Sequence, residues 1–500
     1  MKTRTTALAA VVLLATAPLA ASAGTATAGT TAAGPIAAGP IAAGTATATV
    51  DPAALDRYVA DYADAAAYPG VAVAVTKDDR VVHVSGHGRT SAGADVTAKT
   101  RLPAASVSKA FTSLAAVQLA ERGRLDLDAP VTRYVPEFRL ADDRAGAITT
   151  RHLLEQTSGI TDRTLPEKSL PQPGSFAEAL TRAAPTSLAT DPGAQYRYSN
   201  TNYHLAALVV ERAGGEPFAE YLRRNVFEPA GMRDTTSVTT TPDDLPDDVA
   251  KGYVHVYGAA IPAPEPTRFV AGSDGVLTTA EDLAKWLVVQ TTGRATTGAR
   301  LVSDAGLRRM HTPSTPDRTY ALGWETANGR VRHSGIWFTH CAGQLLLPSG
   351  YGIAVLANTG VALGNEGTSR LEDGLAAFLD GTTPAEPSTA RVPIELVLAA
   401  LTLLSLALGV RALRRPWRRR STAQSVLRLM PRLGPVTVLL LLPTVLGVLV
   451  GGGRDLSAVQ LAYYSPALVI WLAVSSALNL AVLATRATRL LRDRPVPVAG

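Results

Sequence analysis

Residues 102–121 read LPAASVSKAFTSLAAVQLAE, which places a serine and a lysine at the start of a helix predicted over residues 106–121. Ser106 and Lys109 are three residues apart, so in a helix their side chains share one face. A lysine amine in that position can accept the serine proton and return it. Because a serine three residues before a lysine also occurs by chance, the pattern alone indicates only a capped amphipathic helix.

A second polar cluster, Tyr-Ser-Asn at residues 198–200, follows a Pro-Gly turn and precedes a predicted helix over residues 202–213. A phenol, a hydroxyl and a carboxamide at a junction of loop and helix can point into a cleft. There they can transfer protons or donate hydrogen bonds to a substrate.

A third cluster, His-Ser-Gly at residues 333–335, ends a predicted strand over residues 330–332. A basic group, a hydroxyl and a glycine on one strand edge allow a peptide-like substrate to lie alongside in an extended form. The three clusters together indicate nucleophilic catalysis by serine.

Short β-prone runs lie at both ends of the region between residues 51 and 379. Residues 70–76 and 80–86 predict a hairpin, and residues 320–326, 330–335, 343–348 and 352–358 predict further strands. The segments between and beside them predict helices, at residues 51–67, 106–121, 149–155, 202–213, 217–226, 279–290 and 368–379. We therefore expect an α+β fold, with one sheet built from both ends of the domain and a helical lobe inserted.

The three ordered motifs resemble those of the class C serine β-lactamases and their relatives, which include D-alanyl-D-alanine carboxypeptidases, D-aminopeptidases and esterases. The connecting segments at residues 151–160, 227–235, 273–286 and 320–324 are similar to that family as well. The resemblance covers residues 51–379. It implies a β-lactamase/transpeptidase-like fold, with an antiparallel sheet flanked by helices, and hydrolysis through an acyl-enzyme.

The resemblance also implies catalytic roles. Ser106 would be the nucleophile, and Lys109 would be the neighbouring base that activates it. Tyr198 would protonate the leaving group and assist the deacylating water, and either Tyr198 or Lys109 would be the general base. His333 stands where many relatives carry a lysine, and it would orient Tyr198 and favour an anionic group.

Four further residues would bind the substrate. Asn200 would bond a substrate amide, and Ser334 and Gly335 would lie on the strand beside the substrate. The backbone N–H groups of Ser106 and Ile336 would form the oxyanion hole, where one donor is worth roughly 3 kcal/mol.

Two departures from the family pattern are visible. After Gly335 many relatives continue with glycine and proline, whereas residues 336–340 read Ile-Trp-Phe-Thr-His. The aromatic side chains would either narrow the cleft for an apolar acyl group or cover the edge of the sheet. No second carboxylate dedicated to activating water is evident, so efficient antibiotic hydrolysis is not implied.

The ends of the chain indicate export and membrane anchoring. Residues 1–23 predict a signal peptide and residues 24–50 a flexible Ala/Gly/Thr-rich linker, ahead of the hydrolase domain at residues 51–380. After a spacer at residues 381–391, apolar runs at residues 392–410, 433–453 and 461–484 predict three membrane helices. Residues 485–500 would then be a cytoplasmic tail.

The net charge of +6 does not indicate nucleic-acid binding, because it comes from the membrane flanks. Residues 411–432 hold eight arginines, and residues 486–494 hold four arginines and one aspartate. These segments contribute +11, so the remainder of the chain carries −5. Arginine-rich flanks are typical of the cytoplasmic side, which would place the large domain outside the cytoplasm.

We expect neither a metal ion nor another cofactor. His152 and His204 lie in predicted helices without partners at ligand spacing, and no phosphate-binding glycine loop or dinucleotide fingerprint is evident. The single cysteine, Cys341, lies in an apolar run, which indicates a buried filler rather than a reactive thiol.

The sequence therefore predicts a multi-pass membrane protein whose extracytoplasmic serine hydrolase domain acts on peptide, ester or β-lactam carbonyls. The substrate would be a small molecule or a peptidoglycan-type peptide or ester, and the bilayer would be the other partner. The alternative is a penicillin-binding sensor that acylates without efficient turnover and signals through its helices. The oligomeric state is left open.

Overall fold

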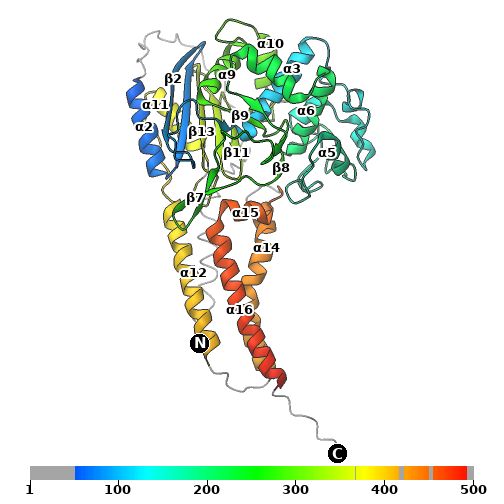
Figure 1. The fold of residues 1–500 in the computed structure, drawn as a ribbon. Helices are drawn as coiled ribbons and strands as arrows, with labels where there is room; N and C mark the ends of the chain where they lie inside the picture. The colour runs from blue at the N-terminus through cyan, green and yellow to red at the C-terminus, as the bar shows by residue number, and fades with distance from the viewer. Residues whose placement is uncertain (1–50, 366, 416–421, 450–453, 493–500) are drawn as a thin grey trace, which may run out of the picture.

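A computed structural model describes residues 51–365, 367–415, 422–449 and 454–492 of the chain. The predicted signal peptide, the linker and parts of the second apolar run and of the tail lie outside the described residues. Figure 1 shows one large domain standing on the ends of long helices.

The main sheet has six antiparallel strands in the order β10-β11-β12-β13-β1-β2. They are β1 (Gly70–Lys77), β2 (Arg80–Gly88), β10 (Glu325–Ala327), β11 (Arg330–Ile336), β12 (Cys341–Leu346) and β13 (Tyr351–Ala357). The β1–β2 hairpin is confirmed, and β1 pairs with β13 along its length. Both ends of the domain therefore build one sheet, as predicted.

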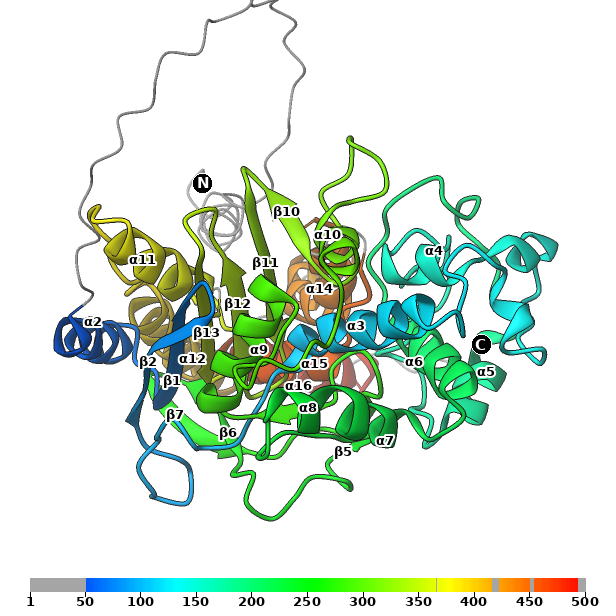
Figure 2. The ribbon, with the colours of Figure 1, turned by 90° about the horizontal axis from the view of Figure 1, so that it is seen from above.

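Alternation along β1 divides the core between the two faces of the sheet. Val71, Val73 and Val75 pack against α2 (Pro52–Ala65) and α11 (Ser369–Leu379). Ala72 and Ala74 belong to the larger core on the opposite face, with α9 (Ala280–Thr292) and α3 (Ser108–Glu121). Figure 2 shows these two helical layers on either side of the strands.

A helical lobe lies between the two sets of strands in the sequence. It contains α4 (Thr150–Leu154), α5 (Phe176–Ala183), α6 (Asn200–Gly214), α7 (Phe218–Leu222), η5 (Arg223–Phe227), α8 (Glu228–Ala230) and α10 (Asp304–His311), with the short segments η2 (Ala105–Val107), η3 (Val131–Arg133) and η4 (Asp143–Ala147). Seven short strands complete the domain in small sheets: β3 (Leu102–Pro103), β4 (Thr236–Ser237), β5 (Thr240–Thr241), β6 (Gly252–Val256), β7 (Ala259–Ala263), β8 (Arg268–Phe269) and β9 (Val276–Thr278). The expected α+β class is confirmed.

Two predicted elements differ from the structure. The strand expected over residues 320–326 is reduced to β10, because Gly323 adopts a left-handed conformation with φ of +78° and turns the chain. A Cβ at Gly323 would lie 2.9 Å from the Lys109 carbonyl oxygen, so this turn packs closely on α3. The helix expected over residues 217–226 continues through η5, which is π-helical.

The C-terminal part consists of α12 (Arg391–Arg414), α13 (Thr422–Leu429), η6 (Met430–Leu433), α14 (Gly434–Leu449), α15 (Ala458–Tyr464) and α16 (Pro466–Arg492). Three segments are long and apolar enough to cross a membrane by length and composition: Arg391–Arg414, Leu427–Val448 and Pro466–Arg489. The third starts later than expected, because Pro466 opens α16 while α15 forms a separate short helix.

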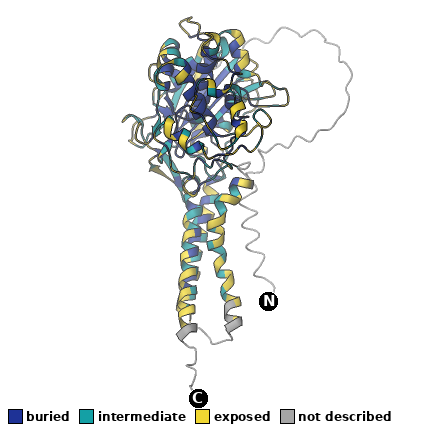
Figure 3. Ribbon diagram, turned by 90° about the vertical axis from the view of Figure 1, so that its right-hand side faces the viewer, coloured by how far each residue is buried: buried dark blue, intermediate teal, exposed yellow. Residues whose placement is uncertain are grey.

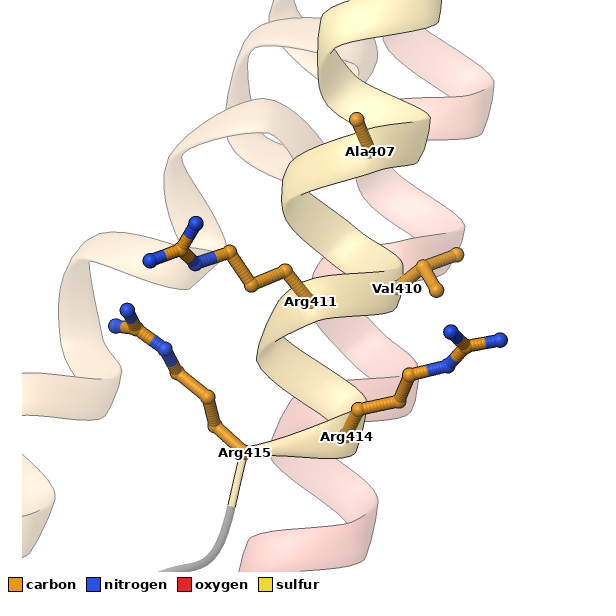
Figure 4. Close-up of a pocket in the computed structure, with 5 residues that line it drawn as sticks. All are labelled: Ala407, Val410, Arg411, Arg414 and Arg415. Carbon is orange, nitrogen blue, oxygen red and sulfur yellow. The ribbon is translucent and has the colours of Figure 1, made fainter.

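The outward faces of these helices are exposed and apolar (Figure 3). Leu403 on α12 is 67% exposed and Leu440 on α14 is 72% exposed. An apolar surface of this kind on long helices is typical of a membrane-embedded bundle. Arg411, Arg414 and Arg415 lie at the end of α12 that is far from the large domain (Figure 4).

Candidate active site

Ser106 lies in a tight turn that enters α3. The preceding residue, Ala105, has φ of +47°, a left-handed conformation that is strained for a residue with a Cβ. Gly335 on β11 packs directly against this turn, since a Cβ there would lie 2.5 Å from the Ala104 oxygen and 3.0 Å from the Ser106 nitrogen. The His-Ser-Gly cluster at residues 333–335 is therefore packed against the turn that carries Ser106.

Lys109 is fully buried one turn after Ser106. Its ammonium donates to Ser106 Oγ at 3.0 Å, Asn200 Oδ1 at 2.9 Å and the Ser273 carbonyl at 3.0 Å. Burial lowers the pKa of Lys109 to about 8, although the nearby Asp274 carboxylate favours its charged form. A large fraction of neutral amine is therefore available near pH 8.

Asp274, which our sequence analysis did not identify, is the second partner of the serine. Ser106 Oγ donates to Asp274 Oδ1 at 2.6 Å, and Arg268 and Asn200 donate to Oδ2 at 2.6 and 3.2 Å. Burial opposes ionisation of this carboxyl group, but Lys109 and Arg268 hold its pKa well below the usual range. The serine hydroxyl thus lies between a buried cation and a buried carboxylate.

Tyr198 precedes α6 and forms part of the wall above Ser106. Its ring centre is 4.9 Å from Lys109 Nζ. Burial raises the pKa of its phenol well above the usual value, while a hydrogen bond with Ser106 acts in the opposite direction. The phenol therefore stays protonated near neutral pH and can donate a proton to a group bound at the serine.

His333 hydrogen-bonds Tyr320, and its ring also lies beside that of Tyr198, with ring centres 6.2 Å apart. Its Nδ1 lies 2.7 Å from the Ser334 carbonyl, which can only accept, and its Nε2 lies 3.0 Å from the Tyr320 hydroxyl. Burial, together with the charge of Lys109, lowers the pKa of His333 to about 3. A neutral imidazole that donates through Nδ1 and accepts from Tyr320 does not supply the positive charge expected for an anionic group.

The remaining predicted binding residues lie on α6 and β11. Asn200 bonds both Lys109 and Asp274, so its carboxamide organises the charged groups, and the residue also lines the cavity over Ser106. On β11, β10 pairs only with residues 330–332, which leaves the edge at Ser334 and Ile336 unpaired by that strand. Ile336 is 39% exposed beside Ser106.

The two aromatic residues after Ile336 lie in different surroundings, and of the two Phe338 lines the cavity. Trp337 is fully buried, and its indole N–H donates to the Asp274 carbonyl at 3.2 Å, so it supports the loop that carries the carboxylate. Phe338 packs edge-on against Tyr463 with ring centres 5.0 Å apart. It therefore joins the catalytic domain to α15.

A cavity of about 710 Å³ lies over Ser106. Its walls include Tyr198, Asn200, Asp274 and His333 from the domain, together with nine residues of the C-terminal part: Leu446, Gly447, Arg454, Asp455, Leu456, Gln460, Leu461, Tyr464 and Ser465. This volume lies within the range of ligand pockets in general, which is roughly 300–1,000 Å³. Among the described residues, no group of three or more His, Cys, Asp or Glu side chains is placed to hold a metal ion.

A family model described as Beta-lactamase matches residues 55–377. The chain belongs to the Beta-lactamase family. It is 31% identical over 300 residues to Protein flp of Staphylococcus aureus strain MW2, covering 58% of this chain and 59% of that protein. It is also 34% identical over 229 residues to Esterase EstB of Burkholderia gladioli, covering 39% of this chain and 58% of that protein.

Among solved structures, the fold is similar to that of the octameric penicillin-binding protein homologue from Pyrococcus abyssi. The TM-score is 0.57 at 24% sequence identity, over 71% of this chain and 82% of that one. The chain spans less than two thirds of the length of its curated relatives in these matches. The β-lactamase/transpeptidase fold expected from the motifs is confirmed.

Sequence reasoning missed three charged residues of this Beta-lactamase family site. Asp274 and Arg268 lie on either side of the mostly apolar run at residues 269–273, and a charge beside such a run is a weak signal of a polar site. Arg454 lies between the second and third predicted apolar runs, where the sequence suggests no catalytic role. Its guanidinium lies 4.6 Å from the centre of the Tyr198 ring, so this segment reaches the candidate active site.

Proposed function

We propose that the chain is a membrane-anchored, extracytoplasmic serine hydrolase that acts on ester, peptide or β-lactam carbonyls through an acyl-enzyme on Ser106. The observation that carries this proposal is the position of the Ser106 hydroxyl, 3.0 Å from the Lys109 ammonium and 2.6 Å from the Asp274 carboxylate under a cavity. A serine hydroxyl is a weak nucleophile unless adjacent groups take its proton and stabilise its developing charge.

Acylation forms a bond between Ser106 Oγ and the substrate carbonyl carbon, and the serine proton leaves to a neighbouring base. Lys109 in its neutral form is suited to be that base, because burial lowers its pKa to about 8. Asp274 accepts the serine hydrogen bond in the resting site and orients the hydroxyl. Once protonated, Lys109 returns the proton to the leaving group through Tyr198.

Collapse of the tetrahedral intermediate breaks the bond to the leaving group, which departs with that proton. Water then attacks the acyl-enzyme, releases the acid and restores the Ser106 hydroxyl. We assign the backbone N–H groups of Ser106 and Ile336 to the oxyanion, since the close packing of Gly335 on the Ser106 turn brings β11 beside the nucleophile. Ser334 and Gly335 would support a substrate that extends along this edge.

The location of the domain is part of the proposal. The predicted signal peptide, the three apolar helices and the arginines at the far end of α12 support export of residues 51–380 and retention of the arginine-rich loop in the cytoplasm. The similarity to a protein named as an esterase supports ester carbonyls among the substrates.

The direct test is turnover of a chromogenic ester, p-nitrophenyl butyrate, and of a D-Ala-D-Ala peptide by the full chain in detergent. We expect the wild type to hydrolyse at least one of them and Ser106→Ala to lose that activity by a factor of about 10³ or more. Equal rates in both proteins would refute the proposal.

The sensor alternative is favoured by one observation, the direct contact of Arg454 with Tyr198, which connects the helices to the site. A sensor would form a stable adduct with penicillin on Ser106 and release it far more slowly than any ester. Mass spectrometry of the adduct over several hours, beside ester turnover, separates a slow-release receptor from a hydrolase.

A further inference from the structure

The cavity over Ser106 is closed on one side by the C-terminal helices. Six of its lining residues on that side are Leu446, Gly447, Arg454, Leu456, Leu461 and Tyr464. The first two belong to Leu427–Val448, one of the segments long and apolar enough to cross a membrane. The cavity that holds the nucleophile therefore reaches the end of a candidate membrane span.

Polar contacts fix this segment to the catalytic domain. Arg454 Nε pairs with Asp162 Oδ2 at 3.2 Å. Asp455 accepts hydrogen bonds from the Ser169 nitrogen at 2.9 Å and from its hydroxyl at 2.8 Å. Because several partners from residues 162–169 engage the turn, we conclude that it is a wall of the site rather than a loosely attached anchor.

Aromatic and apolar contacts continue the same junction. The Tyr463 hydroxyl donates to the Pro264 carbonyl at 2.9 Å, and Phe338 packs against Tyr463. The β6–β7 turn contacts α12 in the same way, since Glu395 of α12 accepts from the Gly258 N–H and the Tyr257 and Thr402 hydroxyls lie 2.9 Å apart. Figure 1 shows the domain seated on the helix ends, with α15 between them.

The lining of the cavity includes Leu446 of α14 and Leu461 of α15, together with Ile336, Val361 and Leu363 of the large domain. Two charged residues of the same lining contact the catalytic groups: Arg268 donates to Asp274 Oδ2 at 2.6 Å, and the Arg454 guanidinium lies 4.6 Å from the centre of the Tyr198 ring. An apolar wall next to a polar catalytic centre, at the end of a membrane span, matches the layered chemistry of an amphiphile at a bilayer surface.

We infer that the substrate is a membrane amphiphile, an ester or amide whose scissile carbonyl lies at head-group level while its hydrocarbon chain contacts Leu446 and Leu456. This inference rests on the proposed function and names its substrate class. The chemical step is unchanged: Ser106 still takes the acyl group, and water still releases it.

The test uses the full chain in phosphatidylcholine nanodiscs and two pairs of ester probes. One pair, p-nitrophenyl palmitate and p-nitrophenyl acetate, places the long chain in the acyl group. The other pair, hexadecyl acetate and ethyl acetate, places it in the leaving group. The measured quantity is the ratio of the kcat/KM values for the long-chain and short-chain members.

Leu446→Trp places a larger side chain in the apolar wall of the cavity. Leu441→Trp on the same helix is the matched control, because Leu441 is 53% exposed and lies outside the cavity lining. Partitioning of the probes into the lipid cancels when the two variants are compared in identical nanodiscs. We expect Leu446→Trp to lower the ratio for at least one pair by about tenfold, within the range for a changed apolar contact. Leu441→Trp should leave the ratio within twofold of the wild-type value.

Equal ratios in the two variants for both pairs would overturn the inference, and hydrolysis of the short esters would then leave the proposed function intact. If Ser106→Ala hydrolyses all four esters as fast as the wild type, the proposed function fails, and this inference fails with it. Leu456→Trp provides a second variant if Leu446→Trp does not fold, and the same drop in ratio is expected.

Discussion

Ser106 Oγ donates a hydrogen bond to Asp274 Oδ1 at 2.6 Å while accepting one from Lys109 Nζ at 3.0 Å. The two residues are 168 positions apart in the chain. Ser106 lies in η2, just before α3, and Asp274 lies in the segment before β9. In this arrangement the carboxylate orients the hydroxyl and stabilises the lysine, while burial makes the lysine a base near neutral pH. Four predictions follow from it and from the packing around it.

The rate of acylation is expected to rise with pH and to level off above about 8. The pKa of Lys109 is lowered to about 8 by burial, so below that pH the amine is mostly protonated and cannot take the serine proton. Burst kinetics with p-nitrophenyl acetate between pH 5 and 10 measure this. Lys109→Arg should lose both the activity and its dependence on pH, because a guanidinium stays protonated between pH 5 and 10.

Asp274→Asn is expected to lower kcat/KM by about 10² or more, because the hydroxyl loses its ionised acceptor. The substitution also removes the charge that favours protonated Lys109, so the midpoint of any residual pH profile should move to lower pH. Thermal unfolding of the same sample checks that the fold is retained. An unchanged kcat/KM would show that the carboxylate has no catalytic role.

Arg454→Gln is expected to move the midpoint of the acylation profile to higher pH. The positive charge of Arg454 is one of the groups that lower the pKa of Lys109, so its removal makes the amine more basic. Arg454→Lys keeps the charge and should retain the wild-type midpoint. If Arg454 had only a structural role, Arg454→Gln would lower the rate of acylation without moving the midpoint of the pH profile.

Gly335→Ala is expected to destabilise the domain by roughly 1–3 kcal/mol and to lower kcat, since the added methyl group would overlap the turn before Ser106. Gly146→Ala is the control, because a Cβ there meets nothing within 4 Å. Chemical denaturation and ester turnover of both variants provide the comparison. Equal stability of the two would contradict the close packing of β11 on the nucleophile turn.

Much of the fold and of this site could be predicted from the sequence, because motif spacing and hydrophobic periodicity are local patterns. The serine and lysine lie one turn apart, so a local pattern is enough to predict their proximity. The hairpin and the strands near residues 330–358 were predicted from alternation and turn residues, and their pairing with β1 followed from one shared sheet. The family and the fold were recognised from the order of the three motifs.

The remaining features depend on contacts between segments far apart in the chain. An apolar run beside Asp274 is only a weak local sign of a polar site, because the role of this carboxylate is created by Lys109 and Arg268 around it. Burial and the charge of Lys109 lower the pKa of His333, and its ring nitrogens contact Tyr320 and the Ser334 carbonyl, so its state also depends on the folded environment. Arg454 reaches Tyr198 only because the C-terminal helices pack under the domain, and hydropathy does not encode that packing.

The central claim is best tested by intact-mass and peptide mass spectrometry of the full chain after reaction with a fluorophosphonate probe. We predict one adduct, on the peptide that contains Ser106, which is absent in Ser106→Ala and forms far more slowly in Lys109→Arg. Labelling of another residue, or equal labelling of the wild type and Ser106→Ala, would contradict the assignment of Ser106 as the activated nucleophile.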